Sequence, residues 1–189
     1  MNRTVTTLSL ALALAAGVPA LAHATEYKRI VAEDSAIGFS YSQMGVTLEG
    51  GFDTFSGELH YDPASPESAR AVIEVALGSV RTGIAEADGE VQDKSWFNSA
   101  VFPTARFEST AVTPLGDDRV EVAGTLTIKG ATQPLVVPAT IRHSGNEAVF
   151  DGDFTIQRGD FAVGEGVWSK FDVVANDINV RFRITAAAE

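Results

Sequence analysis

The sequence contains no cysteine, which excludes disulfide bonds, thiolate metal sites and lipid attachment through an N-terminal cysteine. Histidine is scarce as well, and His60 and His143 lack the close spacing to other ligands that zinc sites need. No G-x-S-x-G nucleophile motif is present. The acidic residues between Glu86 and Asp93 do not match a calcium-loop spacing, so we interpret them as a solvated helix face. The sequence therefore predicts a protein that is not an enzyme and that has no metal or cofactor.

Basic residues are few: 14 Lys and Arg stand against 25 Asp and Glu, for a formal net charge of −11. Nucleic acids are bound through clustered basic side chains that release counterions, so no nucleic-acid partner is predicted. Electrostatic docking on an anionic membrane is disfavoured for the same reason. We interpret the acidic excess as a source of solubility.

Long hydrophobic runs are absent except near the N-terminus. Arg3 precedes an apolar run at positions 8–18, Pro19 follows it, and Ala22-His23-Ala24 offers small residues at a cleavage site. The run is shorter than the roughly 20 apolar residues that span a membrane. This order is typical of a secretory signal peptide at 1–24, cleaved before Thr25. Positions 25–189 then form one exported domain.

The rest of the chain alternates between apolar and polar residues with period two. One such run, near the C-terminus, consists of Ile178, Val180, Phe182 and Ile184 separated by polar side chains. This pattern is typical of strands with one buried face, and turn signals separate about eight or nine such runs. Glycines at Gly50-Gly51, Gly57 and Gly124 suit bulges or tight bends. The sequence predicts an all-β, antiparallel fold, a barrel in preference to a sandwich.

One segment departs from this alternation. Between Ile84 and Phe97 the apolar residues are three and four positions apart, which predicts a short helix across one end of the β-structure. Thr82 is a candidate cap for its start, and Pro103 requires that it end nearby.

Aromatic residues are plentiful, with eleven Phe, two Trp and three Tyr. Most lie on the alternating face of a strand or on the expected helix. A closed barrel of about eight strands has an interior that side chains fill or that holds one small ligand. The aromatic residues therefore either fill a core or line a pocket, and periodicity does not separate these cases.

Several stretches, taken in order, resemble the YceI-like polyisoprenoid-binding family between about Tyr27 and Ile184. They are positions 37–45, 49–57, 96–98, 102–109, 122–130, 132–134 and 154–164. The resemblance implies an extended lipocalin-like barrel of about eight strands with a helix near its mouth. It also implies a periplasmic protein that carries a polyisoprenoid or an isoprenoid quinone.

Positions 85–91 depart from a pattern of many family members, because the Arg-Asp-x-His-Leu stretch is replaced by residues without histidine. This segment resembles the branch found near, or fused to, diheme b-type cytochromes, which implies a membrane b-type cytochrome as a partner. Any role of that histidine, including one in head-group preference, does not carry over to this chain.

A polyprenyl chain offers no useful polar handle, so its affinity must come from buried area, roughly 25 cal/mol per Å². The inward faces of the expected strands and helix give a predicted set of ligand-binding residues: Phe39, Tyr41, Phe55, Ile73, Trp96, Phe97, Phe107, Leu126, Ile128, Phe154, Trp168 and Phe182. Trp96, Phe97 and Trp168 are expected nearest the entrance.

Two other hypotheses stay open. One is a filled-core interaction module that partners a membrane cytochrome through its acidic surface. The other is a lipid-modifying enzyme with His60 as its base. No feature of the sequence predicts the oligomeric state.

Overall fold

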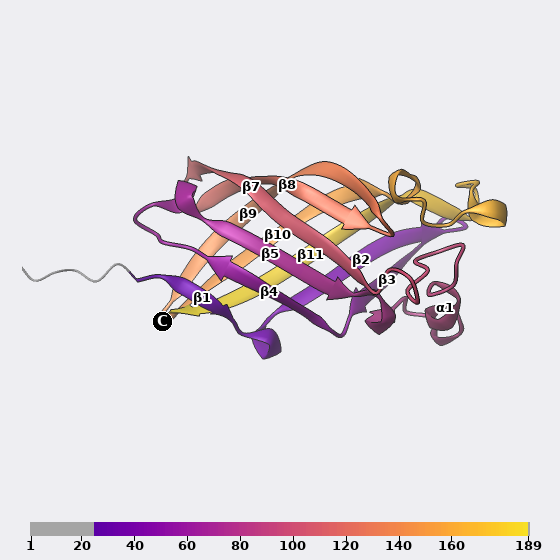
Figure 1. Ribbon diagram of the computed structural model, residues 1–189, viewed down its shortest axis with the longest axis horizontal. Helices are drawn as coiled ribbons and strands as arrows, with labels where there is room; N and C mark the ends of the chain where they lie inside the picture. The colour runs from indigo at the N-terminus through magenta and orange to yellow at the C-terminus, as the bar shows by residue number, and fades with distance from the viewer. Residues whose placement is uncertain (1–24, 189) are drawn as a thin grey trace, which may run out of the picture.

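The alternating runs form one antiparallel sheet of eleven strands that curls into an elongated barrel (Figure 1). This computed structural model describes residues 25–188, so the predicted signal peptide lies outside the described residues. The strand order is β4-β5-β7-β8-β9-β10-β11-β2-β3-β6, and β1 pairs with β11. The strands are β1 (Tyr27–Ile30), β2 (Ala36–Gln43), β3 (Val46–Phe52), β4 (Phe55–His60), β5 (Arg70–Ala76), β6 (Val80–Arg81), β7 (Thr104–Gly116), β8 (Arg119–Ile128), β9 (Ala131–Ser144), β10 (Glu147–Gln157) and β11 (Val174–Ala188).

The predicted all-β fold with one short helix is confirmed, but the sheet has more strands than the eight expected. The additional ones are short: β1 has four residues and β6 has two, too few for an alternating pattern to be visible. Of these two, β1 helps to close the barrel, whereas β6 is an edge strand that pairs with β3 alone. At one end β1 pairs with β11 and bridges to Tyr61 after β4; at the other, β6 pairs with Gly51 and Phe52 of β3.

The helix is shorter than predicted. It is α1 (Ala85–Glu90), six residues long, and the chain continues to Phe102 through a series of turns. Gly89 in its last turn has a low helix propensity, which favours this early end. Thr82 does not cap it, because Ile84 occupies the N-cap without a side-chain bond. Five 3₁₀ turns complete the fold: η1 (Ala32–Asp34), η2 (Pro66–Ser68), η3 (Leu77–Ser79), η4 (Arg158–Phe161) and η5 (Gly166–Trp168).

The register of the long strands separates an inner from an outer face. On β10 and β11, Phe154 lies opposite Val180 and Ile156 opposite Ile178, with these side chains directed inward. On the outer face, Asp151 forms ion pairs with Arg142 and Arg183 of the flanking strands. Period two thus places apolar side chains in the barrel and charged ones in water.

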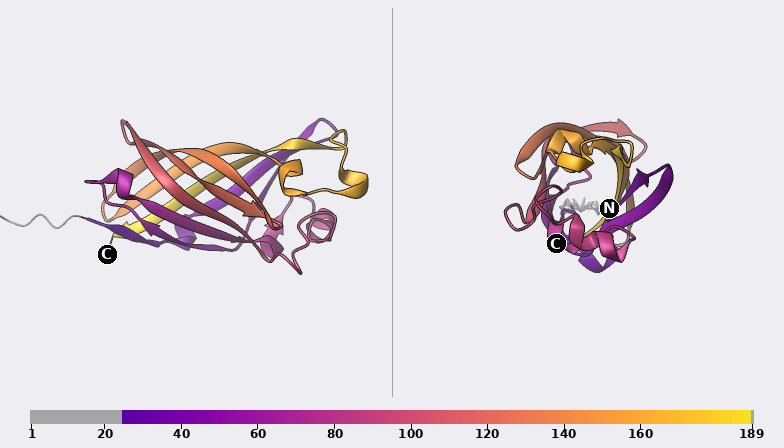
Figure 2. Two further views of the ribbon diagram at one scale, coloured as in Figure 1. Left: turned by 45° about the horizontal axis from the view of Figure 1, so that its top comes forward. Right: turned by 90° about the vertical axis from the view of Figure 1, so that its right-hand side faces the viewer.

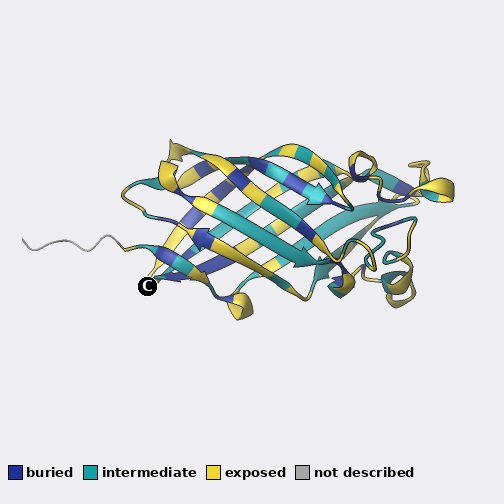
Figure 3. Cartoon of the chain, in the orientation of Figure 1, coloured by how far each residue is buried: buried dark blue, intermediate teal, exposed yellow. Residues whose placement is uncertain are grey.

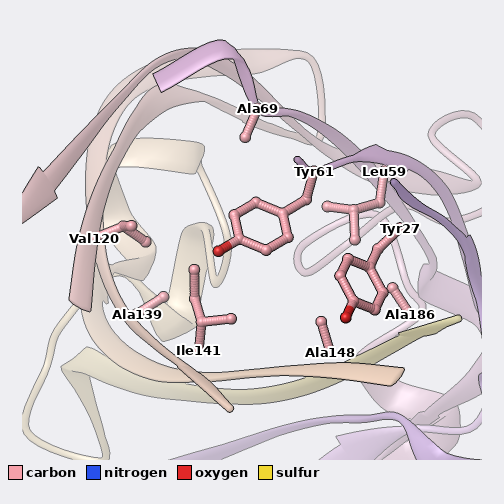
Figure 4. Packing of buried hydrophobic residues seen from close by; sticks show 9 residues of the cluster. All are labelled: Tyr27, Leu59, Tyr61, Ala69, Val120, Ala139, Ile141, Ala148 and Ala186. Carbon is pink, nitrogen blue, oxygen red and sulfur yellow. The ribbon is translucent and has the colours of Figure 1, made fainter. Parts of the chain in front are cut away.

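Buried apolar side chains gather at the two ends of the barrel. The terminal-end cluster is Tyr27, Leu59, Tyr61, Ala69, Val120, Ala139, Ile141, Ala148 and Ala186 (Figure 4). The helix-end cluster is Leu77, Trp96, Ala105, Leu126, Ile128, Phe161, Val163 and Val174. Between them the inward residues are only partly buried, and the middle of the barrel is drawn mostly in the intermediate colour (Figure 3). The interior is therefore packed at its ends and open in its middle.

Candidate ligand-binding cavity

An elongated cavity of about 340 Å³ occupies the interior of the barrel. Its wall extends from Tyr61 in the terminal-end cluster to Trp96 and Trp168 near α1, and every long strand contributes to it. On β10 it runs at least from Phe150 to Ile156, which at about 3.3 Å per residue is roughly 20 Å along the strand. The volume lies in the range of about 300–1,000 Å³ that is typical of small-molecule sites.

Eleven of the twelve residues predicted to bind ligand lie on this wall: Phe39, Tyr41, Ile73, Trp96, Phe97, Phe107, Leu126, Ile128, Phe154, Trp168 and Phe182. The structure brings them together, while their contact with a ligand stays a prediction. Phe55 is outside the wall, although Val75, which it faces across the ladder, is part of it. Phe55 begins the edge strand β4, beyond the part of the sheet that encloses the cavity.

The wall also contains residues that the sequence reasoning missed. Ile37, Ile156, Ile178 and Val180 share strands and parity with residues that were found, so the same alternation could have identified them. Phe161 and Val163 come from the turn after β10, where no period-two pattern exists to reveal them.

The polar groups at the helix end are occupied by the fold itself. The Tyr41 hydroxyl donates to the Thr82 carbonyl oxygen at 3.0 Å, and burial is the main cause of its raised pKa. Thr82 donates from its backbone N–H and its hydroxyl to Asp88 Oδ1, at 2.7 and 2.8 Å, and these bonds lower the pKa of Asp88. These hydroxyl and carboxylate groups therefore have little hydrogen-bonding capacity left for a ligand.

Arg158 organises the loop that covers the helix end. Its side chain is 3% exposed, has no carboxylate partner within residues 25–188, and burial lowers its pKa. It donates instead to carbonyl oxygens of the 163–175 segment, including Val163 at 2.8 Å and Val174 at 2.9 Å. Its guanidinium also lies 5.4 Å from the Trp96 ring centroid. The buried charge thereby fixes an apolar cover, since carbonyl dipoles surround it.

One donor in this wall has no partner. Trp96 is 8% exposed, and its Nε1–H is buried without a hydrogen bond to any residue between 25 and 188. Leaving such a group unpaired costs about 1–3 kcal/mol.

Three aromatic rings of the wall lie over glycines of neighbouring strands. A Cβ built on Gly50 would come within 2.4 Å of the Phe39 ring, and one on Gly152 within 2.6 Å of the Phe182 ring. Gly124, beside a bulge in β7, has the same relation to another phenylalanine ring at 2.7 Å. The predicted bend at Gly124 thus coincides with a bulge.

Neither histidine of the described chain is among the residues that line the cavity. His60 Nδ1 is 3.4 Å from Glu26 on the surface, and His143 stacks on Tyr61 outside the cavity. Within residues 25–188, no three His, Cys, Asp or Glu side chains gather as a metal site, and no helix is long and apolar enough to cross a membrane. The wall offers hydrocarbon surface, which suits binding of an apolar molecule.

At the helix end the cavity lining reaches solvent, because it includes the exposed Glu90 of α1, the half-buried Gln43 at the end of β2 and Trp168 of η5. We call this end the mouth; the view in the right panel of Figure 2 faces it. At the opposite end, Arg70 is the charged lining residue, and its guanidinium turns back to the Ala69 carbonyl at 2.7 Å.

An antiparallel barrel with an enclosed apolar cavity defines a lipocalin-type binding protein. The YceI-like domain model matches residues 29–186, and the chain belongs to this family. A UPF0312 protein of Pseudomonas syringae pv. syringae is 32% identical over 134 residues, which cover 67% of this chain and 70% of the relative.

Solved structures agree with this assignment. Burkholderia cenocepacia BcnA has a TM-score of 0.81 at 32% identity, with 84% of this chain and all of BcnA covered. A polyisoprenoid binding domain from Saccharophagus degradans has a TM-score of 0.68 at 20% identity, with 88% of this chain and all of that domain covered. At that identity the second likeness concerns the fold.

Proposed function

We propose that this protein is a periplasmic carrier that holds one long isoprenoid chain in the barrel interior. The observation that carries the proposal is the continuous apolar cavity between Tyr61 and the mouth. An isoprene unit has four backbone bonds and spans about 5 Å when extended. A cavity roughly 20 Å long along its strands therefore accepts roughly four units. The binding domain from Saccharophagus degradans supports the same ligand class.

The affinity has a simple physical source. Burial of several hundred Å² of chain, at roughly 25 cal/mol per Å², gives several kcal/mol, from which the cost of ordering the chain is subtracted. No charged partner is needed, which agrees with a wall whose buried cation, Arg158, is already surrounded by carbonyl oxygens.

An isoprenoid with an oxygen-bearing head, such as a quinone, is favoured over a plain hydrocarbon. Trp96 lines the helix end of the cavity, and its indole N–H has no hydrogen-bond partner there. A ligand carbonyl placed beside this ring would accept that hydrogen bond after a small shift of the indole. The head would then lie near the mouth and the tail would point toward Tyr61.

The periplasmic location is supported by the signal-peptide pattern at positions 1–24. A membrane b-type cytochrome as partner is supported only by the sequence resemblance of the 85–91 segment, and a quinone carrier is compatible with it. The filled-core alternative does not fit a barrel with a cavity of about 340 Å³. The enzyme alternative loses its base, because His60 lies outside the wall.

Mass spectrometry of the organic extract from natively exported protein tests the proposal. We expect one prenyl lipid or quinone in near-stoichiometric amount, and its retention by delipidated protein when it is added back. A clean extract, together with failure to take up added polyprenol or ubiquinone, would refute the carrier function.

A further inference from the structure

The cavity ends at the side chain of Tyr61. Within the terminal-end cluster, Val120 and Ile141 belong to the cavity wall, whereas Tyr27, Ala148 and Ala186 lie beyond it. Tyr61 is an aromatic wall residue at this boundary; it is 6% exposed and its ring extends across the interior toward Val120 and Ile141 (Figure 4). A chain that enters from the mouth therefore meets this ring last.

The ring is held firmly in place. Its backbone pairs with Tyr27 through two hydrogen bonds of 2.9 and 3.1 Å, which close the barrel between β1 and β4. The Phe150 ring meets it edge-on at a centroid distance of 5.2 Å, and His143 stacks on it at 6.0 Å. Aromatic pairs of this geometry restrain a side chain, so Tyr61 is a fixed stop.

The residues around the ring are small or lie against the wall. Ala69 and Ala139 line the cavity at this level, and neither reaches across it (Figure 4). The next bulky groups beyond it are the Tyr27 and His143 rings, each with its centroid 6.0 Å from that of Tyr61. Removal of the Tyr61 ring would thus lengthen the cavity by about one isoprene unit, which spans about 5 Å.

We propose that Tyr61 sets the maximum length of isoprenoid chain that the barrel accepts. This inference rests on the proposed carrier function and adds a specificity-determining residue to it. Units beyond the limit would stay outside the mouth in water and add no buried area.

The test uses linear all-trans prenyl alcohols of three to eight isoprene units as probes, bound to the delipidated full-length mature protein. For wild type we expect the affinity to rise by about tenfold or more with each added unit and then to level off. In Tyr61→Ala the plateau should begin one unit later. Tyr61→Phe is the matched control, because it keeps the ring and should keep the wild-type limit.

Tyr61 belongs to a packed cluster, so Tyr61→Leu is measured in parallel, with circular dichroism and thermal unfolding as checks of folding. The leucine variant keeps an apolar side chain that is shorter across the barrel and should shift the plateau in the same direction. The same plateau in wild type and in a folded Ala or Leu variant would overturn the assignment of Tyr61 and leave the carrier function intact. Absence of binding by wild type at every length would refute both.

Discussion

Val180 offers the sharpest test of whether ligand occupies the middle of the barrel. It lies on β11 between Phe154 of β10 and Phe39 of β2, lines the cavity, and is only partly buried. A tryptophan at this position grows into empty space instead of into packed neighbours. We therefore expect Val180→Trp to fold normally while the cavity is blocked, a better choice than the more buried Leu126.

The size of the effect follows from area. A buried aromatic side chain covers about 150–250 Å², which is wall that the ligand would otherwise contact. At about 25 cal/mol per Å², the lost burial amounts to about 4–6 kcal/mol. Because 1.4 kcal/mol corresponds to a tenfold change, the affinity should fall by at least about a thousandfold.

The assay measures ligand in the organic extract of exported Val180→Trp protein and its Kd for an added prenyl alcohol. The matched control is Thr155→Trp, which places the same side chain on the exposed outer face of β10. The control should retain ligand as wild type does. Stoichiometric ligand in a folded Val180→Trp variant would show that the chain does not pass through the middle of the barrel.

Three further perturbations test the supporting structure. Arg158→Lys should lower the free energy of unfolding by about 3–5 kcal/mol, since a lysine with three donors replaces six hydrogen bonds to carbonyl oxygens; an unchanged denaturant midpoint would contradict this. Gly152→Ala should lower the free energy of unfolding by about 1–3 kcal/mol, because the added Cβ would stand 2.3 Å from a backbone oxygen of β9. Gly89→Ala, which has open space around it, should be neutral or stabilising in the same thermal unfolding series. The two Thr82 hydrogen bonds lower the pKa of Asp88 in the folded protein. The stabilising effect of this carboxylate is therefore full above its ordinary pKa of 3.8 and is lost as the pH falls through the lower folded value. The difference in Tm between wild type and Asp88→Asn should shrink over that acid range, and a constant difference would refute this pH dependence.

The sequence was sufficient for the parts of the fold that depend on local periodicity. On β11, the alternation that includes Phe182 identified both the strand and its inward face, so the same alternation also covered Val180, which was left out of the predicted set. The two-residue strand β6 has no period to detect, and the six-residue helix ends at Glu90 although apolar spacing continues to Phe97. Short elements are defined by their tertiary partners, so a local pattern cannot reveal them.

The loop that covers the helix end could not be predicted for a related reason. Phe161 and Val163 reach the cavity because the buried Arg158 side chain holds the following segment by its carbonyl oxygens. A lone arginine after a strand carries no signal that it will be buried. The alternation of residues along a strand likewise predicts which side chains point inward, but not whether side chains from opposite walls of the barrel are in contact. A filled core and an open cavity therefore could not be distinguished from the sequence.

The glycines explain why this barrel is open although its aromatic content suits a filled core. At Gly50, Gly124 and Gly152 the missing side chain leaves a hollow in the wall, and a phenylalanine ring from the adjacent strand occupies it. Phe39 and Phe182 lie directly across the ladder from Gly50 and Gly152, so each ring covers its neighbour strand instead of crossing the interior. Large apolar side chains therefore line the wall without filling the space, and the same residues that would make a core elsewhere form the surface against which an isoprenoid chain packs.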